Sequence, residues 1–150
     1  KGQKNTLREQ ENGMYNIIID TSILIGHLRG SSSDFKLLET KKATEGVSLL
    51  IPHIVIVELF TGEEARKKAI REKIDKLIEG LEVVGLTVVS ARMAGDLQRK
   101  YKQIPDLPDL IIAAIAIDQE AQVATHNKKH FEQIRGLKLY DFPVSVSSKN

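Results

Sequence analysis

Residues 15–25 read Tyr-Asn-Ile-Ile-Ile-Asp-Thr-Ser-Ile-Leu-Ile, and this stretch decides the fold. Its three consecutive isoleucines favour a buried strand, and the apolar spacing that follows Ser22 is typical of a helix. Asp20 stands between the two. An ionised carboxylate beside a hydrophobic strand costs several kcal/mol unless it is paired, caps a helix or binds a metal ion. Because open α/β sheets place their ligands at the carboxyl ends of strands, Asp20 is either a functional residue or the cap of the helix that begins near Thr21.

The composition narrows the class of protein. The chain has 150 residues, enough for one domain with an ordinary hydrophobic core. It has no cysteine, which excludes a disulfide framework and a thiolate metal site. Its apolar runs are too short to cross a bilayer and no signal-peptide pattern is present, so we expect a cytoplasmic protein without a membrane partner. The net charge of +2 permits a nucleic-acid partner without requiring one.

The two ends of the sequence differ from the rest. Residues 1–13 are polar and lack apolar periodicity, so we interpret them as a flexible or artificially added tail. We expect a single domain over residues 14–144 and a frayed end over residues 145–150.

Strand and helix patterns alternate along this domain, which predicts an α/β fold with a mostly parallel sheet. One segment, residues 54–61, is ambiguous: its β-branched residues favour a strand, whereas Glu58 and the preceding proline permit a short helix. By propensity we predict a strand there. The remaining helices are expected at residues 21–28, 34–44, 63–79, 90–101, 110–120 and 128–135, and the remaining strands at 47–51, within 81–89, at 121–125 and at 137–140.

Three acidic residues share an unusual setting. Asp20 ends a strand, Glu58 interrupts an apolar segment, and Asp109 opens a buried helix. If these carboxylates meet at one edge of the sheet, their mutual repulsion requires raised pKa values or a cation. Mg²⁺ and Mn²⁺ prefer such oxygen ligands, and an ion held by them activates water and stabilises charge on a phosphoryl oxygen. The pattern therefore indicates a candidate magnesium or manganese site.

Four stretches, in this order, resemble the PIN-domain ribonucleases, and most closely the VapC-like toxins of bacterial and archaeal toxin–antitoxin pairs. They are Ile-Ile-Asp-Thr-Ser-Ile-Leu-Ile-Gly-His-Leu-Arg-Gly (18–30), Val-Glu-Leu-Phe-Thr-Gly (57–62), Leu-Pro-Asp-Leu-Ile-Ile-Ala-Ala-Ile-Ala (107–116) and Ala-Thr-His-Asn-Lys-Lys-His-Phe (124–131). The resemblance implies a three-layer α/β sandwich, a homodimer, and Mg²⁺- or Mn²⁺-dependent endonucleolytic cleavage of RNA restrained by a cognate antitoxin. It also places Glu58 on a short helix, against the propensity of that segment.

The same motifs imply the roles of particular residues. Asp20, Glu58 and Asp109 become the catalytic, metal-binding acids. The family's fourth acidic position falls at Asn127, which offers a carbonyl oxygen but no charge. His130 occupies a nearby position and either supports the site or packs against its neighbours.

Other residues near these motifs have two interpretations each. Thr21, Ser22 and Thr125 support the acids, or they only begin a helix and extend a strand. Asp106 is more readily a turn former, and His27 and His53 are more readily surface or loop residues. The basic side chains expected either to ring the cleft and bind RNA phosphates or to form a solvated surface are Arg29, Arg99, Lys100, Lys102, Lys128 and Lys129.

Two other enzyme classes fit poorly. A haloacid-dehalogenase-type phosphatase needs a second acid two residues after the first, where Ser22 stands. Nucleotide-binding switches need a Gly-Lys-Ser/Thr phosphate loop or a Gly-x-Gly-x-x-Gly turn, and neither occurs in the sequence. The alternative from a different class is a catalytically inert PIN module that binds a protein partner or RNA. The neutral Asn127 favours that alternative, and the three acids oppose it.

Overall fold

The computed structural model describes residues 15–102 and 105–143. The expected tail at residues 1–13, the expected frayed end at 145–150 and both limits of the expected domain lie outside the described residues. Within them the chain forms a five-stranded sheet in the order β3-β2-β1-β4-β5, with every neighbouring pair parallel. The strands are β1 (Asn16–Ile19), β2 (Ser48–Pro52), β3 (Glu82–Val84), β4 (Gln122–Ala124) and β5 (Lys138–Leu139).

The central strand β1 organises the sheet. Ile18 is in register with Leu50 of β2 on one side and with Val123 of β4 on the other. Successive side chains of a strand point to opposite faces, yet Ile17, Ile18 and Ile19 are all fully buried. Both faces of the sheet are therefore covered, which explains why the strand is a continuous apolar run instead of an alternating one.

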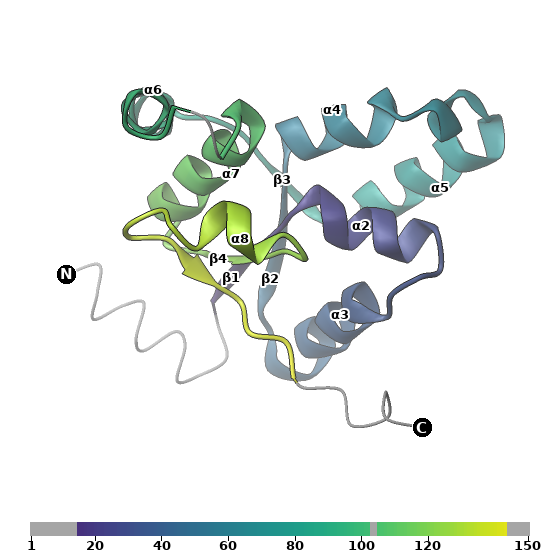
Figure 1. The fold of residues 1–150 in the computed structure, drawn as a ribbon. Coiled ribbons are helices and arrows are strands. Elements are labelled where there is room, and N and C mark those ends of the chain that lie inside the picture. Colours follow the sequence, from purple (N-terminus) through teal and green to yellow (C-terminus); the bar gives the residue numbers. More distant parts are fainter. Residues whose placement is uncertain (1–14, 103–104, 144–150) are drawn as a thin grey trace.

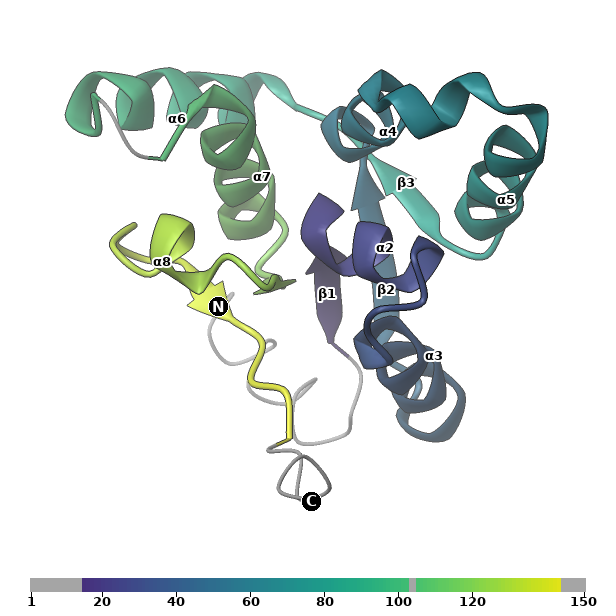
Figure 2. The same cartoon turned by 45° about the vertical axis from the view of Figure 1, so that its right-hand side comes forward.

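Helices flank the sheet (Figures 1 and 2), and the predicted α/β sandwich with its parallel central sheet is confirmed. Helix α7 is apolar nearly all round and is the most deeply buried of them, as its sequence predicts. No helix among the described residues is both long and apolar enough to span a membrane. The helices are α2 (Thr21–Leu28), α3 (Asp34–Glu45), α4 (His53–Thr61), the 3₁₀ helix η1 (Glu63–Arg66), α5 (Lys68–Glu79), α6 (Val88–Lys100), α7 (Leu107–Asp118) and α8 (Lys128–Phe131).

The strand predicted by propensity at residues 54–61 is wrong, because this segment is helix α4. Pro52 ends β2 and takes the N-cap position with extended backbone. Val55 and Leu59, one helical turn apart, are buried, whereas Val57 between them is exposed. Burial of one helical face outweighs the weak strand preference of the β-branched residues. The helix implied by the family resemblance is confirmed.

Two predicted helices need correction, one for a break and one for its start. The helix expected over residues 63–79 is interrupted at Lys67, whose backbone is extended (φ −79°, ψ 131°), so that η1 and α5 are separate. Helix α6 begins two residues before the expected cap: the Thr87 hydroxyl accepts from the Ser90 amide at 3.0 Å, and the Ser90 hydroxyl accepts from the Thr87 amide at 2.8 Å. This reciprocal capping box satisfies two backbone donors that the helix leaves without partners.

The start of α7 and the end of α8 also differ from expectation. Asp106, expected as a turn former, is the N-cap of α7, and its carboxylate accepts from the Asp109 amide at 3.1 Å. The helix therefore starts at Leu107, with Asp109 inside its first turn. Helix α8 stops at Phe131 instead of residue 135, and the chain continues in turns around the buried Ile134.

Candidate active site

The three acids singled out in the sequence line one cleft of about 520 Å³. Asp20 follows β1 directly, Glu58 lies on α4, and Asp109 lies in the first turn of α7. Asp106 and Asn127 line the same cleft. Parallel strands end at the same edge of the sheet, so residues distant in sequence meet there.

Asp20 is 3% exposed and does not cap α2 with its side chain, although it occupies the N-cap position. Its Oδ2 atom accepts hydrogen bonds from the Ser22 hydroxyl at 2.8 Å and from the Thr125 hydroxyl at 2.7 Å. Its backbone amide donates to the Ala124 carbonyl at 3.0 Å, which ties it to β4. The two hydroxyl donors offset the burial of the carboxylate and fix its orientation in the cleft.

Glu58 is held by the residue that follows Asp20. The Thr21 hydroxyl donates to Glu58 Oε1 at 2.6 Å and so connects α2 to α4. Burial raises the pKa of the Glu58 carboxyl, the Thr21 bond lowers it, and repulsion from Asp20 and Asp106 raises it further. Thr21 thus stabilises the charged form of Glu58 in a negatively charged setting.

Asp109 is the acid whose charge the fold disfavours most clearly. Burial is the largest cause that raises its pKa to about 7, and repulsion from Asp106 and Asp20 adds to it. His130 acts in the opposite direction, with its Nδ1 atom 3.1 Å from Asp109 Oδ2. Near neutral pH, Asp109 is therefore divided between its protonated and ionised forms, and a cation in the cleft would favour ionisation.

The turn after β4 brings further polar groups to the cleft. Thr125 is 2% exposed, and its hydroxyl accepts from the Asn127 amide at 2.9 Å while it donates to Asp20. The Asn127 side chain makes no capping bond to α8. Asn127 and His130 are exposed, and both line the cleft. Thr125 therefore joins Asp20, which follows β1, to the polar turn after β4.

Most donors of the cleft fit a hard divalent cation, because they are carboxylate, amide and hydroxyl oxygens, and the rings of His126 and His130 lie among them. Among residues 15–102 and 105–143, no three acidic or histidine side chains already stand close enough to hold an ion together. Glu58 instead binds the Thr21 hydroxyl, and Asp109 contacts His130. Like-charged carboxylates repel one another, which disfavours their close approach without a cation between them.

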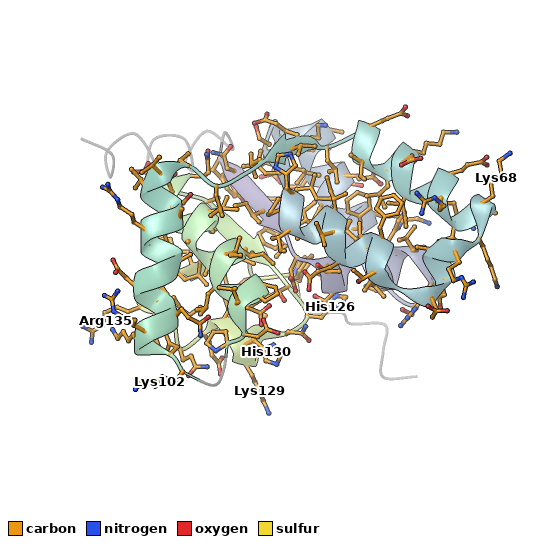
Figure 3. All side chains as sticks on the ribbon, turned by 90° about the horizontal axis from the view of Figure 1, so that it is seen from above. Lys68, Lys102, His126, Lys129, His130 and Arg135 are labelled. Carbon is orange, nitrogen blue, oxygen red and sulfur yellow. The ribbon has the colours of Figure 1, made fainter. Side chains whose placement is uncertain are left out.

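Two features of this region were missed from the sequence. Asp106 lines the cleft as well as capping α7. An Asp placed before a proline and an apolar run is a helix-start pattern, which would have identified the cap. The second is His126, which lines the cleft and lies with its Nε2 atom 2.8 Å from Asp34 Oδ2, 92 residues away in sequence. No sequence pattern links the two. His126 and His130, both labelled in Figure 3, line the same cleft.

The expected ring of basic side chains around the cleft is only partly present. Arg29 lines the cleft, with its Nε atom 3.7 Å from Glu64 Oε1. Arg99, Lys100, Lys102, Lys128 and Lys129 are exposed but are not part of the cleft lining. Figure 3 places Lys102 and Lys129 on the side of the molecule where His130 lies. The sequence does not show where long exposed side chains point, so it left open which of these basic residues line the cleft.

His27 and His53 lie outside the cleft lining. The His27 ring packs against Phe35 with the ring centroids 4.8 Å apart, and His53 is exposed at the start of α4. Neither contributes to the candidate active site.

Comparisons with known proteins agree with this arrangement. The family described as the PIN domain matches residues 17–137. Ribonuclease VapC10 of Mycobacterium tuberculosis is 33% identical over 127 residues, which cover 81% of this chain and 90% of the relative. Ribonuclease VapC1 of Rickettsia felis is 33% identical over 146 residues, which cover 89% of this chain and 98% of the relative.

Solved structures show the same fold. VapBC2 from Rickettsia felis, bound to a DNA fragment from its promoter, contains a chain that is 25% identical with a TM-score of 0.74, and the match covers 85% of this chain and 99% of that one. A toxin–antitoxin complex from Klebsiella pneumoniae contains a chain that is 26% identical with a TM-score of 0.62, and the match covers 84% and 99% of the two chains.

Proposed function

The chain belongs to the PIN-domain family, and from this premise we propose that it is a Mg²⁺- or Mn²⁺-dependent endoribonuclease, the toxin of a toxin–antitoxin pair. The observation that carries the proposal is the meeting of Asp20, Glu58 and Asp109 in one cleft. Clustered acids destabilise a fold, so a structural role alone does not account for them. The related VapC ribonucleases supply the reaction class.

Asp20 and Asp109 would hold the cation directly, with Glu58 as a ligand or as the holder of a water. Asn127 would add a neutral oxygen from the opposite turn. When bound, Mg²⁺ or Mn²⁺ lowers the pKa of a water and stabilises charge on a phosphoryl oxygen. RNA hydrolysis would proceed by in-line attack of a water oxygen on the phosphorus, with cleavage of the bond between the phosphorus and the leaving ribose oxygen, which takes up a proton, and without a covalent enzyme intermediate.

The chain's own residues prepare this chemistry. Ser22 and Thr125 fix Asp20, and Thr21 fixes Glu58, through hydroxyl donors that leave the other carboxylate oxygens available to the cleft. The Nδ1 atom of His130 lies 3.1 Å from Asp109 Oδ2, where the histidine lowers the pKa of Asp109 and so favours the ionised carboxylate that a cation needs.

Binding of the RNA itself rests on fewer observations. Among the lysines and arginines of the described residues, Arg29 lines the cleft. It would contact a phosphate near the acids. The basic side chains outside the lining, Arg99, Lys100, Lys128 and Lys129, would contact more distant phosphates.

Two protein partners belong to the proposal. The first is a cognate antitoxin, supported by the toxin–antitoxin complexes among the structural relatives. The second is another copy of this chain. Five of the seven large apolar side chains exposed in the described residues lie on or beside α4, α6 and the start of α7, which share one side of the molecule in Figure 1. They are Val57, Leu86, Val88, Val89 and Leu107.

The test is cleavage of a mixed pool of cellular RNA by the purified protein with Mg²⁺, with Mn²⁺ and with EDTA. We expect metal-dependent cleavage by the wild type that Asp20→Asn and Asp109→Asn abolish. Asp75→Asn, an exposed acid on α5, is the matched control and should cleave normally. Cleavage that persists in EDTA or in both cleft variants would contradict the proposal. A folded wild type that cleaves nothing would instead favour the inert binding module, for which the neutral Asn127 is the supporting feature.

A further inference from the structure

Gly26 occupies an interior position of α2, where a glycine costs about 1 kcal/mol relative to alanine. Its backbone does not require glycine, since its φ lies outside the left-handed region. A Cβ atom at this position would lie 3.2 Å from Ser32 Cβ and 3.4 Å from His126 Cε1. The missing side chain therefore makes room for the chain after α2 and for the His126 ring.

His126 is fixed at two further points. Its backbone amide donates to the Ser22 hydroxyl at 3.0 Å, the same hydroxyl that binds Asp20. Its ring Nε2 atom lies 2.8 Å from Asp34 Oδ2. Asp34 is the first residue of α3, and its own amide donates to the Ser32 hydroxyl at 3.2 Å. The ring orientation is thus set by α2, α3 and the turn after β4.

This pairing determines which ring nitrogen carries hydrogen. An ionised carboxylate only accepts hydrogen bonds, so the nitrogen that faces Asp34, Nε2, must be the protonated one. In the neutral ring Nδ1 is then a hydrogen-bond acceptor. His126 lines the acid cleft, its side chain is 35% exposed, and Asp34 is not part of that lining. The ring therefore lies between Asp34 and the cleft, and Nδ1 is the ring nitrogen that Asp34 does not engage and that could accept from a donor group of a ligand.

Among the groups of an RNA strand, the ribose 2′-hydroxyl is a donor present on every nucleotide and absent from DNA. We propose that His126 is a specificity-determining residue that accepts a hydrogen bond from a ribose 2′-hydroxyl through Nδ1, with Asp34 and Gly26 as its positioning residues. The inference rests on the proposed ribonuclease function and adds the group by which this cleft distinguishes RNA from DNA.

The test measures binding in EDTA, so that no strand is cut. Fluorescence anisotropy compares a labelled single-stranded RNA with the same base sequence built from 2′-deoxynucleotides, at about pH 8. For the wild type we expect RNA to bind about fivefold more tightly, the effect of one neutral hydrogen bond. Equal affinity for the two strands, or no measurable binding of either, would overturn the inference.

Two substitutions of His126 separate its ring nitrogens. His126→Gln keeps a donor near the Nε2 position, and hence the Asp34 contact, but has no atom equivalent to Nδ1. It should bind both strands equally. His126→Asn places an acceptor near the Nδ1 position and should retain part of the preference for RNA. If His126→Gln keeps the wild-type ratio of RNA affinity to DNA affinity, the inference is wrong. Equal weakening of RNA and DNA binding would keep that ratio and would show that the residue is only structural.

The positioning residues and a control complete the design. Asp34→Asn no longer fixes the protonated nitrogen and should lower the preference for RNA without abolishing binding. His53→Gln, an exposed histidine outside the cleft, should leave the preference unchanged. A protein that cleaves RNA but shows no His126-dependent preference contradicts this inference alone. One that shows the preference without metal-dependent cleavage contradicts the nuclease proposal alone.

Discussion

Removing the charge of Asp109 should stabilise the metal-free protein, by an amount that grows with pH. The fold raises the pKa of Asp109 to about 7, whereas an unfolded Asp titrates near pH 3.9. Because the folded pKa is the higher one, the folded state binds the proton more tightly. Stability from this group is fully present below about pH 4 and is lost as the pH rises to about 7.

The size of the effect follows from the same difference. Three pKa units correspond to about 4 kcal/mol at pH 8, and we halve this to about 2 kcal/mol because solvent screens a side chain at the rim of a cleft. About a third of that loss has already occurred at pH 5. Asp109→Asn cannot ionise, so it should exceed the wild type in free energy of unfolding by about 2 kcal/mol at pH 8 and by only about 0.7 kcal/mol at pH 5.

Urea unfolding in EDTA at these two pH values measures the difference. Asp75→Asn, exposed on α5, is the matched control and should follow the wild type at both. The reasoning is refuted if Asp109→Asn is no more stable than the wild type at pH 8, or if its advantage is the same at pH 5. In melting temperature, 2 kcal/mol corresponds to about 4–8 °C for a chain of this size.

Three further outcomes are expected. Thr125→Val removes the donor to Asp20 Oδ2, so it should lower the free energy of unfolding in urea by about 1–3 kcal/mol and slow RNA cleavage. An unchanged cleavage rate would show that Thr125 does not support the site. Val88→Glu replaces a 70%-exposed apolar side chain with a charged one. In light scattering the variant should be a monomer where the wild type is a dimer, at an unchanged melting temperature. A variant that stays dimeric would place the interface elsewhere. Thr87→Ala removes the α6 cap and should cost about 1 kcal/mol in urea unfolding, against little change for exposed Thr44→Ala, and equal losses would argue against the capping box.

Much of the fold follows from local sequence patterns. The isoleucine run of β1 and the nearly all-apolar α7 must be buried on every side, so their sequence patterns predict their central positions in the fold. Residues 54–61 fail by propensity because the β-branched preference is weak beside the burial of Val55 and Leu59 on one helical face. The family motif, which reflects the packed protein, gives the helix correctly.

The candidate site was only partly accessible from the sequence. The acids were found because carboxylates inside apolar segments need an explanation, and the structure places all three in one cleft. The contact between His126 and Asp34 depends on how the turn after β4 meets α3, which no local pattern encodes. The directions of Lys128 and Lys129 were also not predictable, because long exposed side chains are not fixed by their own sequence.

The most direct test of the account is calorimetric titration of Mn²⁺ into the wild type, Asp20→Asn and Asp109→Asn, with Asp75→Asn as control, since it needs no knowledge of the RNA target. We predict binding by the wild type and the control, accompanied near neutral pH by proton release as Asp109 ionises, and loss of binding in both cleft variants. Binding of equal strength in Asp20→Asn and Asp109→Asn would contradict the claim that these carboxylates hold the metal.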